Sequence, residues 1–163
     1  MFRIESLKEE DRGAVRALEL FCLRETLENS LTKKWSELSQ ELIDQLGASS
    51  KTSFEHYLRQ GLSYVAKEDS MIVGFIFAQM IPHILSLPSV IWIENLGVHP
   101  EFRRKGIAYK LLKTVASEGK KLGAKAIYST IMPDNIRSIM LHKKLGFFVD
   151  SRKIALLDLD RFE

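Results

Sequence analysis

The sequence predicts a protein of the α/β class, because strand-like and helix-like segments alternate along its 163 residues. Hydrophobic residues make up 45% of the chain and charged residues 28%, which is the balance of a soluble globular protein. The clearest strand-to-helix succession is Val90–Leu112, where a β-branched and aromatic run is followed by a basic turn and then by apolar residues at helical spacing. A chain of this length is most simply one domain, spanning residues 1–163.

The N-terminal part of the chain is predicted to contain one strand followed by helices. The predicted segments are a strand at residues 2–7, helices at about 9–29 and 35–46, a loop at 48–53 and a short helical turn at 54–59. Cys22 lies on the apolar stripe of the first helix and is expected to be a buried small hydrophobe. A single cysteine excludes an internal disulfide framework and is typical of a reducing, cytoplasmic compartment.

Three further strands are predicted in the middle of the chain. Residues 62–67 and 71–81 form a hairpin, and Pro82–Pro88 is expected to be the loop into the central strand. Pro100 cannot donate a ladder hydrogen bond, so the central strand should end near His99. The longest apolar run, Met71–Ile81, is too short to span a bilayer, so we expect no membrane association.

The C-terminal part should complete the sheet. A fifth strand is predicted at residues 125–131, and the next helix should begin after Pro133 with Asp134 as its cap. The last two strands are expected at 147–149 and 154–157, joined by a short connection.

The turn at Arg103–Ala108 has the features of an anion site. Free backbone N–H groups and the positive end of the helix dipole face this turn, and its basic side chains can add charge-assisted hydrogen bonds. Gly106 lets a phosphate approach the backbone, and neither the Walker nor the dinucleotide glycine pattern occurs in the chain. The alternative is an ordinary basic helix start on a solvated face.

Positive charge is concentrated around the same turn. Residues 101–125 contain eight basic and two acidic side chains, although the net charge of the whole chain is only +3. Aromatic residues do not interleave with these charges as a nucleic-acid stacking platform would need, so no nucleic-acid partner is expected. A coenzyme with several phosphates explains the cluster more economically.

Two segments resemble the signatures of the GCN5-related N-acetyltransferase (GNAT) family. Arg103, Gly106 and Ala108 occupy the places of its Gln/Arg-x-x-Gly-x-Gly/Ala motif, and Asn135–Phe147 resembles its Asn-x-x-Ala-x-x-Leu-Tyr-x-x-x-Gly-Phe motif. The resemblance implies a GNAT fold, in which a mixed, largely antiparallel sheet splays after its fourth strand and is flanked by helices. It also implies acetyl-CoA as the acetyl-donating cosubstrate.

The resemblance implies a coenzyme site on the fourth strand, the basic turn and the second motif. The residues expected to bind acetyl-CoA are Leu96, Gly97, Val98, Arg103, Arg104, Lys105, Gly106, Ile107, Ala108, Tyr109 and Asn135. The early helices of the family usually form a wall of the acceptor site. Four carboxylates are available to a cation there, although a solvated face is favoured for each: Glu25, Glu28, Glu37 and Glu41.

Two side chains are candidates for catalysis. Glu94 alternates with Leu96 and Val98 and should share their strand face, where it could act as a base, and Asn95 should point to the opposite face. A salt bridge to a neighbouring helix is the alternative role for Glu94. His142 stands where the family usually has a tyrosine general acid, and the alternative is a surface histidine beside two lysines.

The predicted function is transfer of an acetyl group from acetyl-CoA to a primary amine. The short connection at residues 150–153 leaves the acceptor site open unless a second subunit covers it, which slightly favours a protein or peptide amino group and allows a homodimer. The alternatives are a small-molecule amine acetyltransferase and a non-catalytic acyl-CoA-binding module. The four histidines do not cluster with carboxylates or cysteine in the sequence, so no metal is expected.

Overall fold

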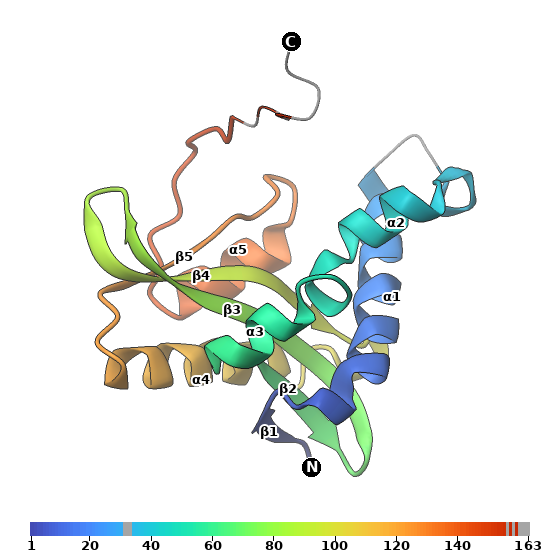
Figure 1. Ribbon diagram of the computed structural model, residues 1–163, viewed down its shortest axis with the longest axis horizontal. Coiled ribbons are helices and arrows are strands. Elements are labelled where there is room, and N and C mark those ends of the chain that lie inside the picture. Colours follow the sequence, from blue (N-terminus) through green and yellow to red (C-terminus); the bar gives the residue numbers. More distant parts are fainter. Residues whose placement is uncertain (31–33, 156, 158, 160–163) are drawn as a thin grey trace. The chain divides into compact units, whose positions relative to one another are not determined.

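The computed structural model describes residues 1–30, 34–155, 157 and 159 (Figure 1). Its contacts divide the chain into two compact units, Met1–Thr130 and Ile131–Glu163, which are described separately below. The single-domain organisation therefore stays a prediction. No helix in the described part of the chain is long and apolar enough to cross a membrane.

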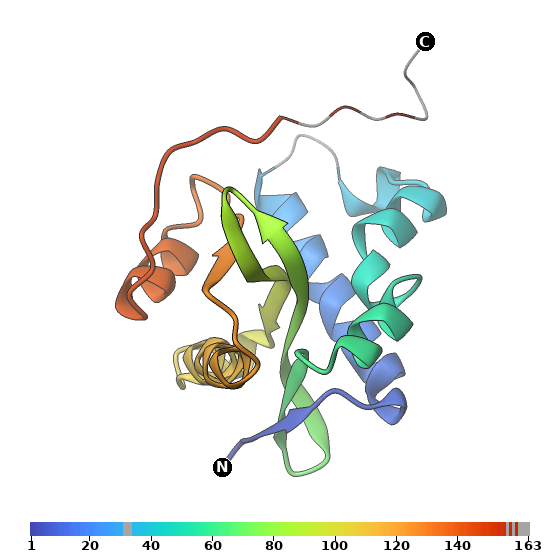
Figure 2. The same cartoon turned by 60° about the vertical axis from the view of Figure 1, so that its left-hand side comes forward.

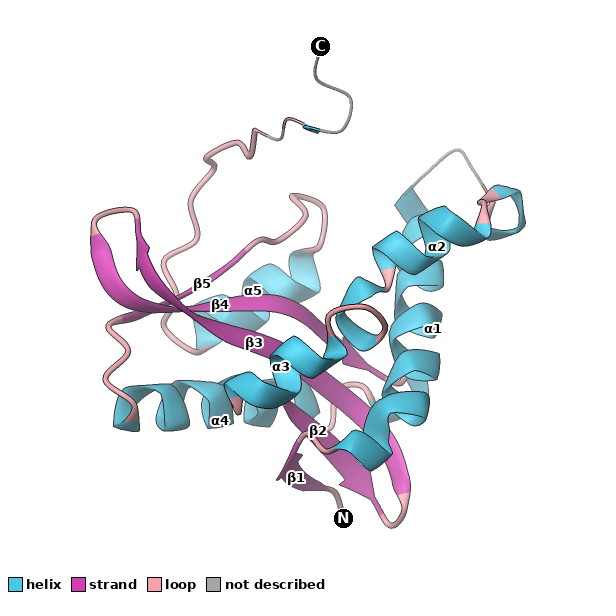
Figure 3. Ribbon diagram, in the orientation of Figure 1, coloured by secondary structure: helices cyan, strands magenta, loops and turns pink. Residues whose placement is uncertain are grey.

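The first unit contains the sheet and most of the helices (Figure 3). Its strands are β1 (Arg3–Ser6), β2 (Tyr64–Glu68), β3 (Met71–Ile84), β4 (Leu87–Val98) and β5 (Ala126–Ser129). Its α-helices are α1 (Arg12–Ser30), α2 (Gln40–Leu46), α3 (Phe54–Gln60) and α4 (Ile107–Lys121). Short 3-10 turns are η1 (Glu9–Asp11), η2 (Trp35–Glu37), η3 (Ala48–Ser50) and η4 (Pro100–Phe102). The second unit contains α5 (Ile136–Lys144).

The strands form a single sheet in the order β1-β2-β3-β4-β5. Neighbours from β1 to β4 are antiparallel, and β5 is parallel to β4, so the predicted mixed and largely antiparallel sheet is confirmed. Helices α1 and α3 cover one face of the sheet and α4 covers the other (Figure 2).

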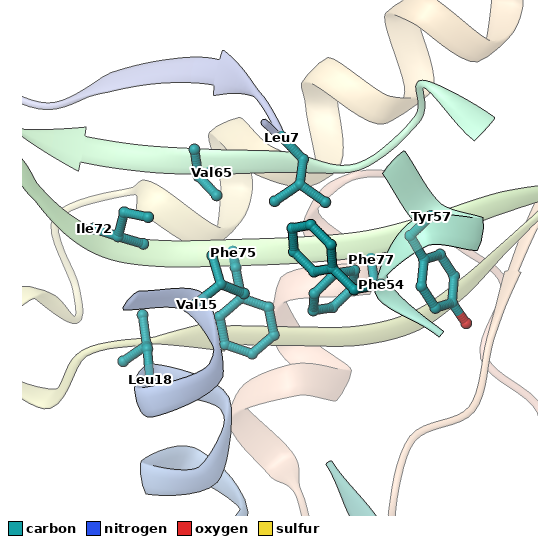
Figure 4. Packing of buried hydrophobic residues seen from close by; sticks show 9 residues of the cluster. All are labelled: Leu7, Val15, Leu18, Phe54, Tyr57, Val65, Ile72, Phe75 and Phe77. Atoms are coloured by element: carbon teal, nitrogen blue, oxygen red, sulfur yellow. The ribbon is translucent and has the colours of Figure 1, made fainter. Parts of the chain in front are cut away.

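The core between the sheet and the α1/α3 layer is mostly aromatic and aliphatic (Figure 4). Its buried members are Leu7, Val15, Leu18, Phe54, Tyr57, Val65, Ile72, Phe75 and Phe77. On the opposite face, α4 buries the residues that recur at helical spacing, among them Ile107, Leu111 and Val115. Gly74 of β3 lies against this helix, because a Cβ at Gly74 would come within 2.8 Å of Ile107 Cγ2.

The sheet splits along β4, as predicted. Val90–Ile93 of β4 pairs with Ala126–Ser129 of β5, whereas β4 itself continues to Val98. The described residues place no strand beside residues 94–98 on the β5 side. Backbone groups on that side of the segment are therefore available to a ligand, except the Val98 carbonyl, which accepts from Arg103 Nε at 3.0 Å.

The prediction of a loop at Pro82–Pro88 is wrong. Strand β3 runs on to Ile84 and β4 begins at Leu87, so the two strands are joined by the two-residue turn Leu85–Ser86. Both turn residues have positive φ, +48° and +67°, which matches the twist of two antiparallel strands. A turn of this kind normally uses Asn or Gly, so the sequence did not indicate it.

The prediction of two strands at 147–149 and 154–157 is also wrong. Among the described residues there, 145–155 and 157, the structure contains no strand. Phe148 and Ile154 are 88% and 73% exposed, so their apolar side chains lack the burial that a sheet face provides. Between them, the Arg152 amide donates to Asp150 Oδ1 at 3.0 Å. Such a local side-chain bond competes with a strand ladder.

Candidate active site

A β-bulge determines which way the side chains of the central strand point. In the β3–β4 ladder Phe77 faces Asn95 and Ala78 faces Ile93, which leaves Glu94 as an extra residue in β4. Asn95 Nδ2 donates to Glu19 of α1 at 2.8 Å, so Asn95 points toward the α1/α3 layer.

Glu94 points toward the same layer. Its Oε2 atom accepts a hydrogen bond from Trp92 Nε1 at 2.9 Å, and the hydroxyl of Tyr57 on α3 lies close enough to its carboxylate to feel its charge. Val98 instead pairs with Gly74, which lies against α4. The prediction that Glu94 shares the face of Leu96 and Val98 is therefore wrong, because the bulge shifts the alternation by one residue.

Tyr57 lies near the carboxylate of Glu94 on the helix side. The ring is only 5% exposed, and burial, followed by the adjacent Glu94 charge, raises the pKa of the Tyr57 hydroxyl far above its ordinary value. The hydroxyl consequently remains a donor at neutral pH. Glu94 itself is exposed, so its remaining lone pairs can reach a ligand.

Behind this pair lies a second carboxylate. Glu19 is 0% exposed and accepts from the Ser50 amide at 3.0 Å, from the Ser50 hydroxyl and from Asn95. The sequence analysis did not single out Glu19 or Tyr57. The available signal was the position of Glu19, four residues after Val15 and beside Leu18 on the apolar stripe of α1.

The basic turn has the backbone of an anion site. Arg104 and Gly106 have positive φ, +63° and +82°, and a Cβ built on Gly106 would meet no atom within 4 Å. Helix α4 starts at Ile107, and its first backbone bond runs from the Lys110 amide to Gly106 O at 3.0 Å. Within the described chain, the amides from Arg104 to Ala108 donate to no carbonyl, and the side chains of Arg104 and Lys105 are exposed.

Arg103 makes different contacts. Its Nε donates to Val98 O at 3.0 Å, and its two amino groups bond to the carboxylate of Glu25 on α1, with Nη1 at 2.9 Å from Oε1. These bonds to Glu25 raise the pKa of the guanidinium. The Arg103 side chain thus ties the end of β4 to α1, and coenzyme binding by this residue stays a prediction.

The acidic side chains expected near an acceptor cation are partly engaged with other groups. Glu25 pairs with Arg103, and Glu28 with Arg24 at 2.9 Å. Together with Phe21 they line a hollow of about 320 Å³ on α1. Glu94 is therefore the better-placed carboxylate for a ligand at the split of the sheet.

In the second unit, Asn135 and His142 lie on α5. Asn135 is the cap of the helix, because its Oδ1 accepts from the Ser138 amide at 3.1 Å, and the prediction that Asp134 is the cap is wrong. His142 is only 3% exposed, with Nδ1 2.8 Å from Ser138 O and its ring edge-on to Phe147. The surface alternative for His142 is therefore wrong, and its catalytic role stays a prediction.

Residues 2–162 match the family described as a protein of unknown function, DUF1999. The chain belongs to the DUF1999 family. The GNAT resemblance predicted for this DUF1999 protein is confirmed by its relatives and by its fold.

Two curated relatives are named for the acceptors that they modify. An aminoglycoside N(6')-acetyltransferase type 1 of Salmonella typhimurium is 30% identical over 95 residues, which cover 56% of the chain and 66% of that enzyme. An L-2,4-diaminobutyric acid acetyltransferase of Halalkalibacterium halodurans is 35% identical over 82 residues, 50% of the chain and 42% of the enzyme. The chain thus spans less than two thirds of the length of either relative.

Other relatives match along almost the whole chain. The uncharacterized N-acetyltransferase YdgE of Bacillus subtilis is 22% identical over 149 residues, which cover 90% of this chain and 91% of YdgE. The structure of the aminoglycoside N-acetyltransferase AAC(6')-Iy in complex with CoA superposes with a TM-score of 0.73 at 22% identity, covering 98% of this chain and 95% of that one. At this identity, the similarity to AAC(6')-Iy establishes the GNAT fold of the DUF1999 protein.

Proposed function

We propose that the protein transfers an acetyl group from acetyl-CoA to a primary amine of a small molecule. The observation that supports this most directly is the split of the sheet: β4 leaves β5 after Ile93 and leads into a helix start whose amides are unpaired within the described chain. The exposed carboxylate of Glu94 lies at the same split.

The coenzyme would be held mainly by backbone groups. Leu96–Val98 offers the unpaired edge of β4 to the pantetheine arm, and the amides of the turn at 104–108 suit the pyrophosphate. The residues fit such a group, because the space beside Gly106 is open and the charges of Arg104 and Lys105 are exposed. Acetyl-CoA would supply the acetyl group as a thioester.

Glu94 is the proposed base for the acceptor. A primary amine is an ammonium ion at neutral pH, so it must lose a proton before its nitrogen can attack a carbonyl. The Trp92 donor fixes the orientation of the Glu94 carboxylate and leaves lone pairs for the ammonium. Glu94 takes the proton directly or through one water molecule.

His142 is the proposed acid for the departing thiolate. Its Nδ1 contact with Ser138 O fixes the ring on α5, and a histidine is a stronger acid than the tyrosine that is usual in the family. Asn135, at the start of the same helix, is proposed to contact the pantetheine arm. Because its Oδ1 atom is used in capping, the Nδ2 amide group is the part that could donate to that arm.

The relatives favour small acceptors over the peptide acceptor that the sequence slightly favoured. The printed names of two relatives state an aminoglycoside and L-2,4-diaminobutyric acid, both of which are small molecules with amino groups. The AAC(6')-Iy structure with the bisubstrate analog CoA-S-monomethyl-acetylneamine, at a TM-score of 0.71, supports the same choice.

The test is an acceptor screen that measures release of the CoA thiol. The protein is incubated with acetyl-CoA and matched panels of aminoglycosides, diamino acids, simple diamines and short peptides, and products are confirmed by mass. We expect turnover with small primary amines and little with peptides. Turnover with peptides alone would refute the small-molecule assignment, and binding of acetyl-CoA without any turnover would indicate a non-catalytic acyl-CoA-binding protein.

A further inference from the structure

Glu19 is a charged side chain in an unusual position. It is fully buried on α1, and its described partners are the uncharged donors of Ser50 and Asn95. The described ion pairs do not include it. Burying a carboxylate without a cation costs free energy that an apolar side chain at the same position would not cost, so packing alone does not account for Glu19.

The partners of Glu19 connect the two elements that form the candidate acceptor site. Asn95 follows Glu94 directly, at the bulge of β4. Ser50 ends η3, which leads into α3 and therefore to Tyr57, whose hydroxyl lies near Glu94. One carboxylate thus holds both the strand that presents Glu94 and the segment that leads to Tyr57.

We propose that Glu19 is a positioning residue that, through its hydrogen bond to Asn95, fixes the bulge and so keeps Glu94 directed at the acceptor. This inference rests on the proposed role of Glu94 as the base. Without the bond from Asn95 to Glu19, the extra residue of β4 can move, and a shift of one position turns its side chain toward the other face of the sheet. A displacement of about 1 Å at a reacting group can lower a rate by about 100-fold.

The first test reports on Glu94 without using catalysis. Trp35 and Trp92 are the two tryptophans of the chain, so Trp35→Phe leaves Trp92 as the sole emitter. Its indole donates to Glu94, and Glu94→Gln in this background should therefore shift its emission. We expect Glu19→Met, which removes both acceptor oxygens at a similar volume, to produce the same shift.

Conservative and indirect variants make this test specific. Glu19→Gln should leave the Trp92 emission as it is in the Trp35→Phe background. The new amide oxygen can accept from Ser50, and the Asn95 amide can flip so that its oxygen accepts from the new amide N–H. Asn95→Ala removes the strand end of the contact and should shift the emission as Glu19→Met does, which keeps the test valid if Glu19→Met does not fold. If Glu19→Gln shifts the Trp92 emission as much as Glu19→Met does, the hydrogen bonds of Glu19 do not position Glu94 and the proposal is overturned.

The second test is kinetic. Glu19→Met should lower kcat about 10- to 100-fold and leave KM for acetyl-CoA within about twofold. In a Glu94→Gln background the same substitution should lower kcat no further, because Glu19 acts through Glu94. If Glu19→Met lowers kcat by the same factor in the Glu94→Gln background as in the unmodified protein, Glu19 does not act through Glu94 and the proposal is overturned.

Asp11 provides the matched control. It is another buried carboxylate, 3% exposed, but it pairs with Lys67 at 2.7 Å and caps η1 through the Lys8 amide. Asp11→Asn should lower the melting temperature without changing the Trp92 emission. If Glu19→Met also lowers the melting temperature without changing the Trp92 emission, Glu19 has only a structural role and the proposal fails. If the unmodified protein acetylates no amine, the proposed function fails, but the emission test still decides the role of Glu19.

Discussion

Replacing Gly106 by alanine separates two roles of the basic turn, its backbone shape and its contact with the coenzyme. Gly106 has a φ of +82°, a left-handed conformation that costs an ordinary residue about 1–2 kcal/mol. A new Cβ would meet no protein atom within 4 Å, so no steric term adds to this cost in the free protein. For a chain of this size the melting temperature should fall by roughly 2–8 °C.

Gly123, just after α4, is the matched control for this substitution. Its φ is +85°, and a Cβ there also meets nothing within 4 Å, so Gly123→Ala should cost the same stability. Because only Gly106 lies among the amides proposed to hold pyrophosphate, Gly106→Ala alone should weaken CoA binding, by about 10-fold or more, which corresponds to about 1.4 kcal/mol.

The assay combines thermal unfolding with calorimetric titration of CoA into each variant. Equal losses of stability with a selective loss of affinity in Gly106→Ala would support the coenzyme turn. Wild-type affinity in Gly106→Ala, or an equal loss of affinity in Gly123→Ala, would refute it.

Three other side chains give further predictions. Glu94→Gln should lower kcat about 10²- to 10⁴-fold, the usual contribution of a general base, while calorimetric affinity for acetyl-CoA stays unchanged; full turnover would remove Glu94 from the mechanism. His142→Phe should lower turnover with coenzyme affinity nearly intact, and His142→Tyr should recover part of the loss in the same thiol-release assay. Cys22 should react slowly with iodoacetamide in the folded protein and rapidly in denaturant, because burial raises the pKa of its thiol and so lowers the thiolate fraction at neutral pH; equal labelling rates by mass spectrometry would contradict this.

The sheet and its helices were predictable where side-chain periodicity is explicit. The apolar runs of β3 and β4 and the 3.6-residue spacing of α4 follow from burial on one face, so sequence and structure agree there. The Leu85–Ser86 turn was not predictable, because positive φ at two non-glycine residues depends on the paired strands around them. The exposed Phe148 and Ile154 show that an apolar run alone does not make a strand.

The candidate site was only partly predictable for a related reason. The glycine and the positive charges of the basic turn are local features, so the sequence alone could propose Gly106 and its neighbours as the coenzyme site. A bulge inserts one residue without leaving a pattern in the strand itself, so the faces of Glu94 and Asn95 could not be assigned. The contact of Glu19 with Asn95 joins residues 76 positions apart, which no local pattern encodes.

The extension of β3 and β4 into a long hairpin arm has a consequence for solubility. Strand β2 pairs with β3 only as far as Ile76, so the β3 edge from Phe77 to Ile84 lacks a strand neighbour on that side in the described chain. An unpaired apolar edge is a template for addition of a foreign strand. On this edge the Ala78 amide donates to Ser63 Oγ at 3.1 Å and the Met80 amide to Gln60 Oε1 at 3.2 Å. Pro82 has no N–H to offer, so this edge has few donors for a foreign strand.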